Sequence, residues 1–295
     1  MSFEEYNRNR CQRCRIEIFD LETGESRTVK QFDRVVEAPN WTEDGKYLVF
    51  NSYGKLYRLN LETGEEETIE TGEAVTCNND HVLEPGGTGI AFSSGIEGDE
   101  DSRIFVKEGL QGKVRMVVSE PLSYLHGWSP DRKTLAFCAA RSYEGKLEWD
   151  IYAVPAKGGE EVRLTDAPGL NDGPEYSRDG KYIWFNSVRT GLMQVWRMDA
   201  DGKRQTQMTF DENMNSWFPH VSPDGTKVVY VCYHKGDLEP GEHLPDKNVE
   251  IRMILAEGGQ EKTLVKLFGG QGTMNVNSWS PDSKKFAYVS YEGEE

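Results

Sequence analysis

A ten-residue phrase occurs six times in this chain and constrains its fold more than any other feature. The first copy reads Trp41-Thr-Glu-Asp-Gly-Lys-Tyr-Leu-Val-Phe50: a hydrophobic residue, a turn and a hydrophobic run. The copies begin at Trp41, Leu83, Trp128, Tyr176, Val221 and Trp279, so successive starts are 42, 45, 48, 45 and 58 residues apart. A period of roughly 40 to 50 residues that contains strands and turns is typical of the blades of a β-propeller.

Each copy predicts a β-hairpin, and a second hairpin follows it. Asp-Gly pairs such as Asp44-Gly45 and Asp224-Gly225 supply the positive φ that tight turns require. The run after each turn is rich in β-branched and aromatic residues, which favour strands. A strand, a Gly-containing turn and another strand come next, as in 195–202. One blade is therefore expected to have four strands, A to D, in the hairpins A-B and C-D.

The two ends of the chain predict how the propeller closes. Residues 16–24 read as a C-D unit with no A-B unit before it, and the A-B unit near 279–290 has no C-D unit after it. Six A-B and six C-D units close into a ring only if the first C-D unit completes the last blade. Such closure leaves no open edge strand at the seam.

These observations predict an all-β fold, a six-bladed β-propeller with four-stranded blades. A closed β architecture of 295 residues forms one domain with a sizeable core. We expect that domain to span 1–295, with an N-terminal tail over 1–12. Residues 14–31 are expected to be the closing strands, paired with residues 276–291.

Composition limits the partners. The net charge is −16, with 50 acidic against 34 basic residues, which argues against nucleic acid or an anionic membrane surface as a partner. No run approaches 18 apolar residues, and residues 1–10 show no apolar signal-peptide core. The five cysteines are an odd number and fit a reducing compartment. The expected location is cytoplasmic.

The repeats resemble those of the TolB-like propeller family, which has PD40 or WD40-like repeats. The resemblance is carried by residues 171–187, 189–191 and 218–225, and it extends over nearly the whole chain. It implies the fold and leaves the function open, because one fold serves many functions. TolB itself is periplasmic and has an extra N-terminal domain that engages partner proteins; neither a signal peptide nor that domain is expected here.

Two further resemblances concern activity. The repeats are less closely similar to the propellers of prolyl-oligopeptidase-type peptidases, whose hydrolase domain has a Gly-x-Ser-x-Gly motif that this sequence lacks. They are also similar to oligogalacturonate lyase at the level of the repeat. That resemblance implies a divalent metal bound by His and Gln, acting on an acidic sugar.

The histidines are candidates for a metal or catalytic site. In a propeller the D-to-A and B-to-C connections surround one mouth of the channel, and all five histidines map to such connections. If His81, His126 and His220 converge, they would bind Mn, Zn, Fe or Ni, and His126 or His220 would serve as metal ligand or general base. Alternatively each histidine only binds water, since the sequence has no local metal motif.

Seven other residues are candidates for binding a ligand at that mouth. Trp217, or else Trp149, would stack on a sugar ring, and Arg141 and Arg189 would hold a carboxylate. The residues expected to bind hydroxyl groups are Asp80, Asp172, Gln271 and Asn275. The alternative for the Asn and Asp residues is a turn cap, in which the side chain bonds its own backbone.

Three functions remain open from the sequence. The favoured one is a cytoplasmic propeller that binds a small polar ligand, a sugar or sugar acid, with or without a His-bound divalent metal and lyase- or hydrolase-type activity. The second is a non-catalytic module that binds a protein through the same face and the insertion at 234–248. The third is a scaffold whose channel holds only water. Whether the protein is an enzyme stays undecided at this point.

Overall fold

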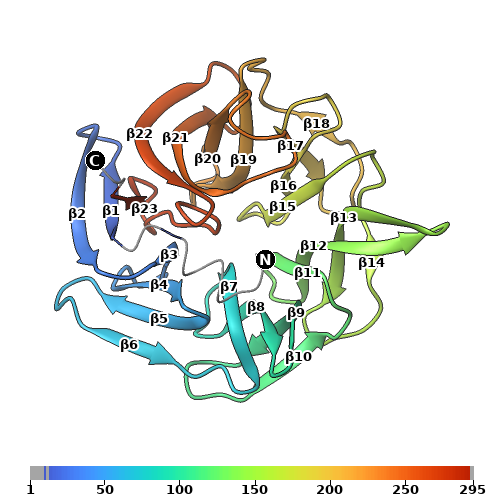
Figure 1. Cartoon of the computed structure of the whole chain (residues 1–295), viewed down its shortest axis with the longest axis horizontal. Coiled ribbons are helices and arrows are strands. Elements are labelled where there is room, and N and C mark those ends of the chain that lie inside the picture. Colours follow the sequence, from blue (N-terminus) through green and yellow to red (C-terminus); the bar gives the residue numbers. More distant parts are fainter. Residues whose placement is uncertain (1–9, 11–12, 293–295) are drawn as a thin grey trace.

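The computed structural model describes residue 10 and residues 13–292, which form six blades around a central channel (Figure 1). It confirms the predicted all-β, six-bladed propeller. Except for Arg10, the predicted tail over 1–12 lies outside the described residues. Within the described part, no helix is long and apolar enough to cross a membrane.

Five blades are contiguous in sequence, and each is a four-stranded antiparallel sheet. Blade one contains β3 (Glu37–Trp41), β4 (Tyr47–Ser52), β5 (Lys55–Asn60) and β6 (Glu66–Ile69). Blade two contains β7 (Ala74–Leu83), β8 (Ile90–Ile96), β9 (Asp99–Lys107) and β10 (Val114–Val118). Blade three contains β11 (Ser123–Trp128), β12 (Thr134–Tyr143), β13 (Lys146–Pro155) and β14 (Val162–Arg163).

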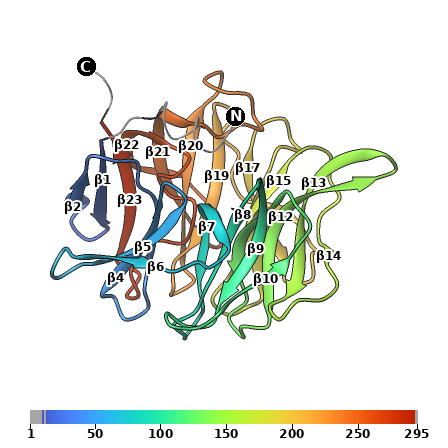
Figure 2. The same cartoon turned by 60° about the horizontal axis from the view of Figure 1, so that its bottom comes forward.

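Blades four and five repeat this order. Blade four contains β15 (Asn171–Tyr176), β16 (Tyr182–Ser187), β17 (Gln194–Asp199) and β18 (Thr206–Gln207). Blade five contains β19 (Met214–Val221), β20 (Lys227–His234), β21 (Pro245–Leu255) and β22 (Lys262–Gly270). In all five, the first strand lies nearest the channel and the last lies at the rim (Figure 1). The hairpin of β12 and β13 projects beyond its neighbours (Figure 2).

The sixth blade joins the two ends of the described chain, as predicted. Its sheet has the order β2 (Glu25–Phe32), β1 (Cys14–Asp20), β23 (Lys285–Tyr291). All seven residues of β1 pair antiparallel with β23, from Cys14 opposite Tyr291 to Asp20 opposite Lys285. The innermost segment of this blade touches β23 through the bridge of Trp279 with Phe286. Closure therefore buries both edges of the seam.

Each interface between neighbouring blades has its own apolar core. The buried apolar side chains of the described residues fall into six clusters; five draw on two adjacent blades, and the sixth, between blades five and six, also includes Met193 of blade four. At the seam, for example, Ile16 and Val289 of blade six pack with Leu48 and Phe50 of blade one, all fully buried. The second strands are almost continuously apolar because both of their faces are covered.

An irregularity interrupts the innermost strand of every contiguous blade. Register shifts fall between Glu37 and Asn40, Cys77 and His81, Leu125 and Gly127, Asp172 and Glu175, and Trp217 and His220. Three of these bulges contain a residue with positive φ followed by proline: Ala38 (54°), Gly173 (63°) and Phe218 (53°). A bulge frees residues from the ladder and re-aims their side chains, which here lie beside the channel.

Candidate functional site

A cavity of about 770 Å³ lies at one end of the channel, which we name the upper mouth. It is bounded by the early part of the innermost strands and by connections between second and third strands. Its lining residues include Glu37, Asn51, Tyr53, Asn78, Asn79, Asp80, Glu100, Asp101, Tyr124, His126, Trp149, Asp172, Phe218, Gly241, His243, Gln271 and Asn275. A volume of roughly 300 to 1,000 Å³ is typical of small-molecule sites.

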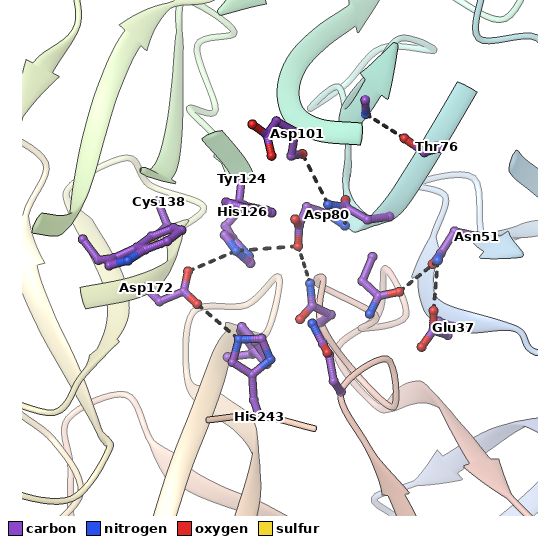
Figure 3. A pocket seen from close by; sticks show the side chains of 18 of the residues that line it. Glu37, Asn51, Thr76, Asp80, Asp101, Tyr124, His126, Cys138, Asp172 and His243 are labelled. Atoms are coloured by element: carbon purple, nitrogen blue, oxygen red, sulfur yellow. Dashed lines mark hydrogen bonds and ion pairs between the residues drawn. The ribbon is translucent and has the colours of Figure 1, made fainter. Parts of the chain in front are cut away.

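Two carboxylates flank one histidine at the centre of this cavity (Figure 3). The Nε2 atom of His126 lies 3.3 Å from Oδ1 of Asp172 and 3.7 Å from Oδ1 of Asp80. The three residues come from three neighbouring blades, on β11, β15 and β7 respectively. All three side chains are buried, with residue exposures of 6 to 7%.

The two carboxylates favour protonation of His126. Burial acts to lower its pKa, but the charges of Asp80 and Asp172, a hydrogen bond to Asp172 and another to the backbone of Asn275 outweigh burial and raise the pKa. The protonated ring carries N–H on both nitrogens, so the flanking carboxylates stabilise the form that donates to them.

The two carboxylates respond differently to the same neighbour. Burial raises the pKa of Asp80 to about 6; His126 opposes this rise and the charge of Asp172 adds to it. Burial also acts to raise the pKa of Asp172, but His126 and, more weakly, His243 and the backbone of Gly173 hold it at about 2. At neutral pH both carboxylates are ionised, and the single histidine between them can offset at most one of the two negative charges.

His243 comes from the connection between β20 and β21 and forms one wall of the cavity. Its Nε2 lies 3.9 Å from Oδ2 of Asp172 (Figure 3). Its ring packs edge-on against Trp217 at 4.4 Å and Phe218 at 5.2 Å between centroids. Burial lowers the pKa of His243, and the charge of Asp172 opposes this. Its buried Nδ1 has no hydrogen-bond partner among the described residues.

Two buried side-chain amides in the cavity lining, those of Asn275 and Asn51, have an oxygen that accepts no hydrogen bond from the described residues. Asn275 donates from Nδ2 to Asp80 Oδ1 at 2.6 Å, and Asn51 donates to Glu37 Oε2 at 3.2 Å and to Asn79 Oδ1 at 2.9 Å. The Oδ1 atoms of Asn275 and Asn51 meet no partner in the part of the chain that the structure describes. The carboxylates fix the amide orientation, because the NH₂ group must face an acceptor.

The sequence-predicted site residues divide into two groups. Five of them line the upper mouth: Asp80, His126, Asp172, Gln271 and Asn275. Trp149, the second candidate for stacking, also lines it, at 5.9 Å from the ring of Tyr124. The other five, His81, Arg141, Arg189, Trp217 and His220, do not line it.

The three histidines expected to converge lie apart. His126 occupies its bulge, whereas His81 and His220 follow theirs and pair in the ladder with Phe92 and Val229. His81 is fully buried, burial lowers its pKa to about 4, and neither ring nitrogen has a partner among the described residues. The D-to-A placement was therefore wrong: each repeat begins at the end of an innermost strand, so these histidines lie inside strands.

His220 belongs to a different polar network. Its Nδ1 lies 2.7 Å from Oε2 of Glu175, and its Nε2 lies 3.3 Å from the carbonyl of Met274. No group of three or more His, Cys, Asp or Glu side chains in the described ranges is arranged to hold a metal ion. The described residues therefore do not fit the metal site predicted from His81, His126 and His220.

Both arginines are engaged away from the cavity. Arg141 donates to both oxygens of Glu161 at 3.0 Å, and Arg189 donates to Asn171 Oδ1 at 2.7 Å and Ser187 Oγ at 2.8 Å. Trp217 is fully buried and supports His243 rather than facing the cavity.

Several lining residues were not among the predicted ones, notably Glu37, Asn51, Tyr124 and Phe218. A usable pattern was present for Phe218: a proline within a predicted strand indicates a bulge. Pro39, Pro174 and Pro219 mark three of the bulges that turn side chains toward the channel.

A smaller cavity of about 220 Å³, the lower mouth, lies at the other end of the innermost strands. Its lining includes Trp41, Leu83, Trp128, Glu175, Arg178, Asn277 and Trp279. Here the side chains of Glu175 and Asn277 use both their donors and their acceptors within the protein. Glu175 accepts from Val221 N at 2.8 Å and from Asn277 Nδ2 at 2.7 Å and contacts His220; Trp279 N donates to Asn277 Oδ1 at 3.2 Å.

Fold and site together define a closed six-bladed propeller with an acidic, partly unsatisfied pocket at one channel mouth. The chain belongs to the TolB-like β-propeller family: the profile described as the TolB beta propeller domain (PD40) matches residues 99–262. An uncharacterized protein of Agrobacterium fabrum (strain C58) is 45% identical over 280 residues, which cover 95% of this chain and 92% of that protein.

Two solved structures and a further sequence relative are also similar to this chain. A structure from Agrobacterium tumefaciens, provisionally assigned as TolB, is 44% identical with a TM-score of 0.88, covering 96% of this chain and 99% of that one. The Tol-Pal system protein TolB of Francisella tularensis (strain WY96-3418) is 25% identical; the match covers 86% of this chain but only 56% of that protein. An oligogalacturonate lyase in complex with manganese shares the fold at 14% identity, with a TM-score of 0.55 and coverage of 95% and 91%.

Proposed function

We propose that this protein binds a small, hydroxyl-rich polar ligand of the sugar class at the upper mouth. The observation that carries the proposal is the cavity of about 770 Å³ in which buried acceptors from several blades face a shared space. Tyr124 and Trp149 supply aromatic surface on which a sugar ring can stack.

The lining favours a sugar over a sugar acid. Arg141 and Arg189, the residues predicted to hold a carboxylate, are engaged with other groups outside the cavity. Asp80 and Asp172 would instead repel an anionic ligand. We therefore propose a non-anionic ligand. We propose binding rather than proton abstraction, because Nε2 of His126 already faces the carboxylates of Asp172 and Asp80.

The insertion between β20 and β21 supports a small ligand over a protein partner. Gly241 and His243 of this insertion turn inward and line the cavity. The insertion therefore forms part of the cavity wall. It gives no specific support to the alternative function, in which the insertion would bind a protein partner. The name of the Francisella relative points to the Tol-Pal system, but this chain matches about half of that protein.

The test is a panel of neutral and amino-substituted mono- to trisaccharides, measured by titration calorimetry on the parent and on Trp149→Ala. We expect at least one saccharide to bind, and Trp149→Ala to weaken it roughly tenfold through loss of stacking. Trp41→Ala is the matched control, since Trp41 lines the lower mouth. Absence of binding across the panel, or equal weakening by Trp41→Ala, would overturn the sugar proposal.

A further inference from the structure

We infer that the ligand of the upper mouth carries a positively charged ammonium group. The inference rests on the proposed function in one respect, that this cavity is the ligand site. It names the charge of the ligand, which the sugar class alone does not.

The first support is the distribution of charge in the lining. Five of the described residues that line the cavity are acidic: Glu37, Asp80, Glu100, Asp101 and Asp172. None of the described lining residues is lysine or arginine. Arg10 neutralises Glu37 from behind in a buried ion pair, so Glu37 is not counted as free charge. Asp80 and Asp172 share one histidine, His126, which can offset at most one of their two negative charges, so an excess of negative charge remains at the cavity.

The second support is independent of charge and concerns hydrogen bonding. Asn275 and Asn51 line the cavity and are buried, with 1% and 3% exposure respectively. The NH₂ group of each donates a hydrogen bond to another side chain of the protein. Their Oδ1 atoms remain acceptors without a donor among the described residues. A buried acceptor without a donor costs about 1 to 3 kcal/mol, so the site favours a ligand that brings N–H donors.

The third support is the aromatic wall. Tyr124 and Trp149 lie 5.9 Å apart between ring centroids and border the same cavity as Asp80. An ammonium group is attracted both to ring faces and to carboxylates. The oxygens of a carboxylate ligand would face the carboxylate and amide oxygens of the lining, and acceptors cannot hydrogen-bond to one another. A neutral hydroxyl compound would leave the excess negative charge of the lining uncompensated.

The experiment compares three pyranoses that differ in charge, glucosamine, glucose and glucuronate, and adds spermidine, a cation without a sugar ring. Binding is measured at pH 7 by ligand-observed NMR and calorimetry at millimolar concentrations. We expect glucosamine to bind roughly tenfold more tightly than glucose, because hydrogen bonds to charged groups are about twice as strong as neutral ones. Glucuronate is expected not to bind.

Substitutions test whether the preference for glucosamine over glucose comes from the carboxylates of the cavity. Asp80→Asn and Asp172→Asn keep the side-chain shape and are expected to remove most of the preference for glucosamine over glucose. Asp201→Asn removes the same charge from an exposed turn after β17 and should leave the preference unchanged. Circular dichroism and thermal melting confirm that each variant is folded.

The outcomes separate this inference from the proposed function. Glucose or glucuronate binding as tightly as glucosamine would overturn the charge inference and leave the sugar site standing. Binding of spermidine without any sugar, sensitive to Asp80→Asn and Asp172→Asn, would support the charge inference and overturn the sugar class. Failure of all four probes to bind would overturn both.

Discussion

The two mouths of the channel are built from the same innermost strands, yet they treat buried polar groups in opposite ways. At the lower mouth, Glu175 accepts hydrogen bonds from Val221 and Asn277 and contacts His220, so the network is closed upon itself. At the upper mouth, Asn275 has an acceptor with no donor among the described residues. A closed network stabilises the fold, whereas an open one leaves hydrogen-bonding capacity for a ligand.

The difference teaches where stability and binding reside in this propeller. Asn275 and Asn277 are two residues apart on one segment, but one faces each mouth and only Asn277 uses both ends of its amide. We expect substitutions at the lower mouth to change the free energy of unfolding. Substitutions at the upper mouth should mainly change ligand affinity.

The largest effect is expected for Glu175→Ala. Removal of this carboxylate leaves Val221 N and His220 Nδ1 without their buried acceptor and removes one of the two bonds that Asn277 Nδ2 donates, so the free energy of unfolding should fall by about 3 kcal/mol. Urea unfolding measures the loss. Glu67→Ala, which removes an exposed partner of Arg58, serves as control and should cost less than about 1 kcal/mol. Equal losses would contradict a closed network.

The asparagine pair gives the sharpest comparison. Asn277→Ala removes two donated bonds and one accepted bond and should cost about 2 kcal/mol of unfolding free energy, with ligand affinity little changed. Asn275→Ala should cost roughly 1 kcal/mol or less, but it should weaken glucosamine binding. Thermal melting and calorimetry on both variants decide this. The reverse pattern would mean that the roles of the two mouths are assigned wrongly.

A pH dependence of cation binding is expected next. The pKa of Asp80 is raised to about 6, by burial first and also by the charge of Asp172, so Asp80 gains a full negative charge as pH rises from 5 to 7. His126 and Tyr124 also face Asp80; His126 has a raised pKa, and the pKa of Tyr124 is raised to about 12, so neither opposes this trend below pH 7. Spermidine should therefore bind roughly tenfold more tightly at pH 7 than at pH 5.

The control for this profile is Asp80→Asn, which should flatten it, because Asp172 has a pKa of about 2 and stays charged throughout this range. Calorimetry at pH 5, 6 and 7 provides the measurement. A profile that is unchanged in Asp80→Asn would assign the titration to another group.

The smallest effects are expected at the turns beside the lower mouth. Gly225 has a φ of 73°, and an added Cβ would meet open space, so Gly225→Ala costs only backbone strain, about 1 kcal/mol. Arg132 holds the equivalent turn position with a φ of 64°, so Arg132→Gly should relieve similar strain and raise the melting temperature. Neither change should alter ligand affinity; a change in affinity would show that the two mouths are coupled.

Much of the fold could be predicted from the sequence because its determinants are local and repeated. The Asp-Gly turns and β-branched runs predict hairpins, and the unpaired units at the two ends predict the closure of β1 with β23. The candidate site was predicted only in part. Asp80, His126 and Asp172 line one cavity at the upper mouth, but His81 and His220 do not converge with His126.

The physical reason is that side-chain direction in a strand depends on register, and one extra residue reverses it. The repeat by itself determined a closed propeller of six blades and a polar channel. Only the tertiary structure decided which polar groups meet. It places His126 in a bulge between two carboxylates from neighbouring blades and leaves His81 buried behind the ladder, because bulges and blade-to-blade contacts join residues that are distant in sequence.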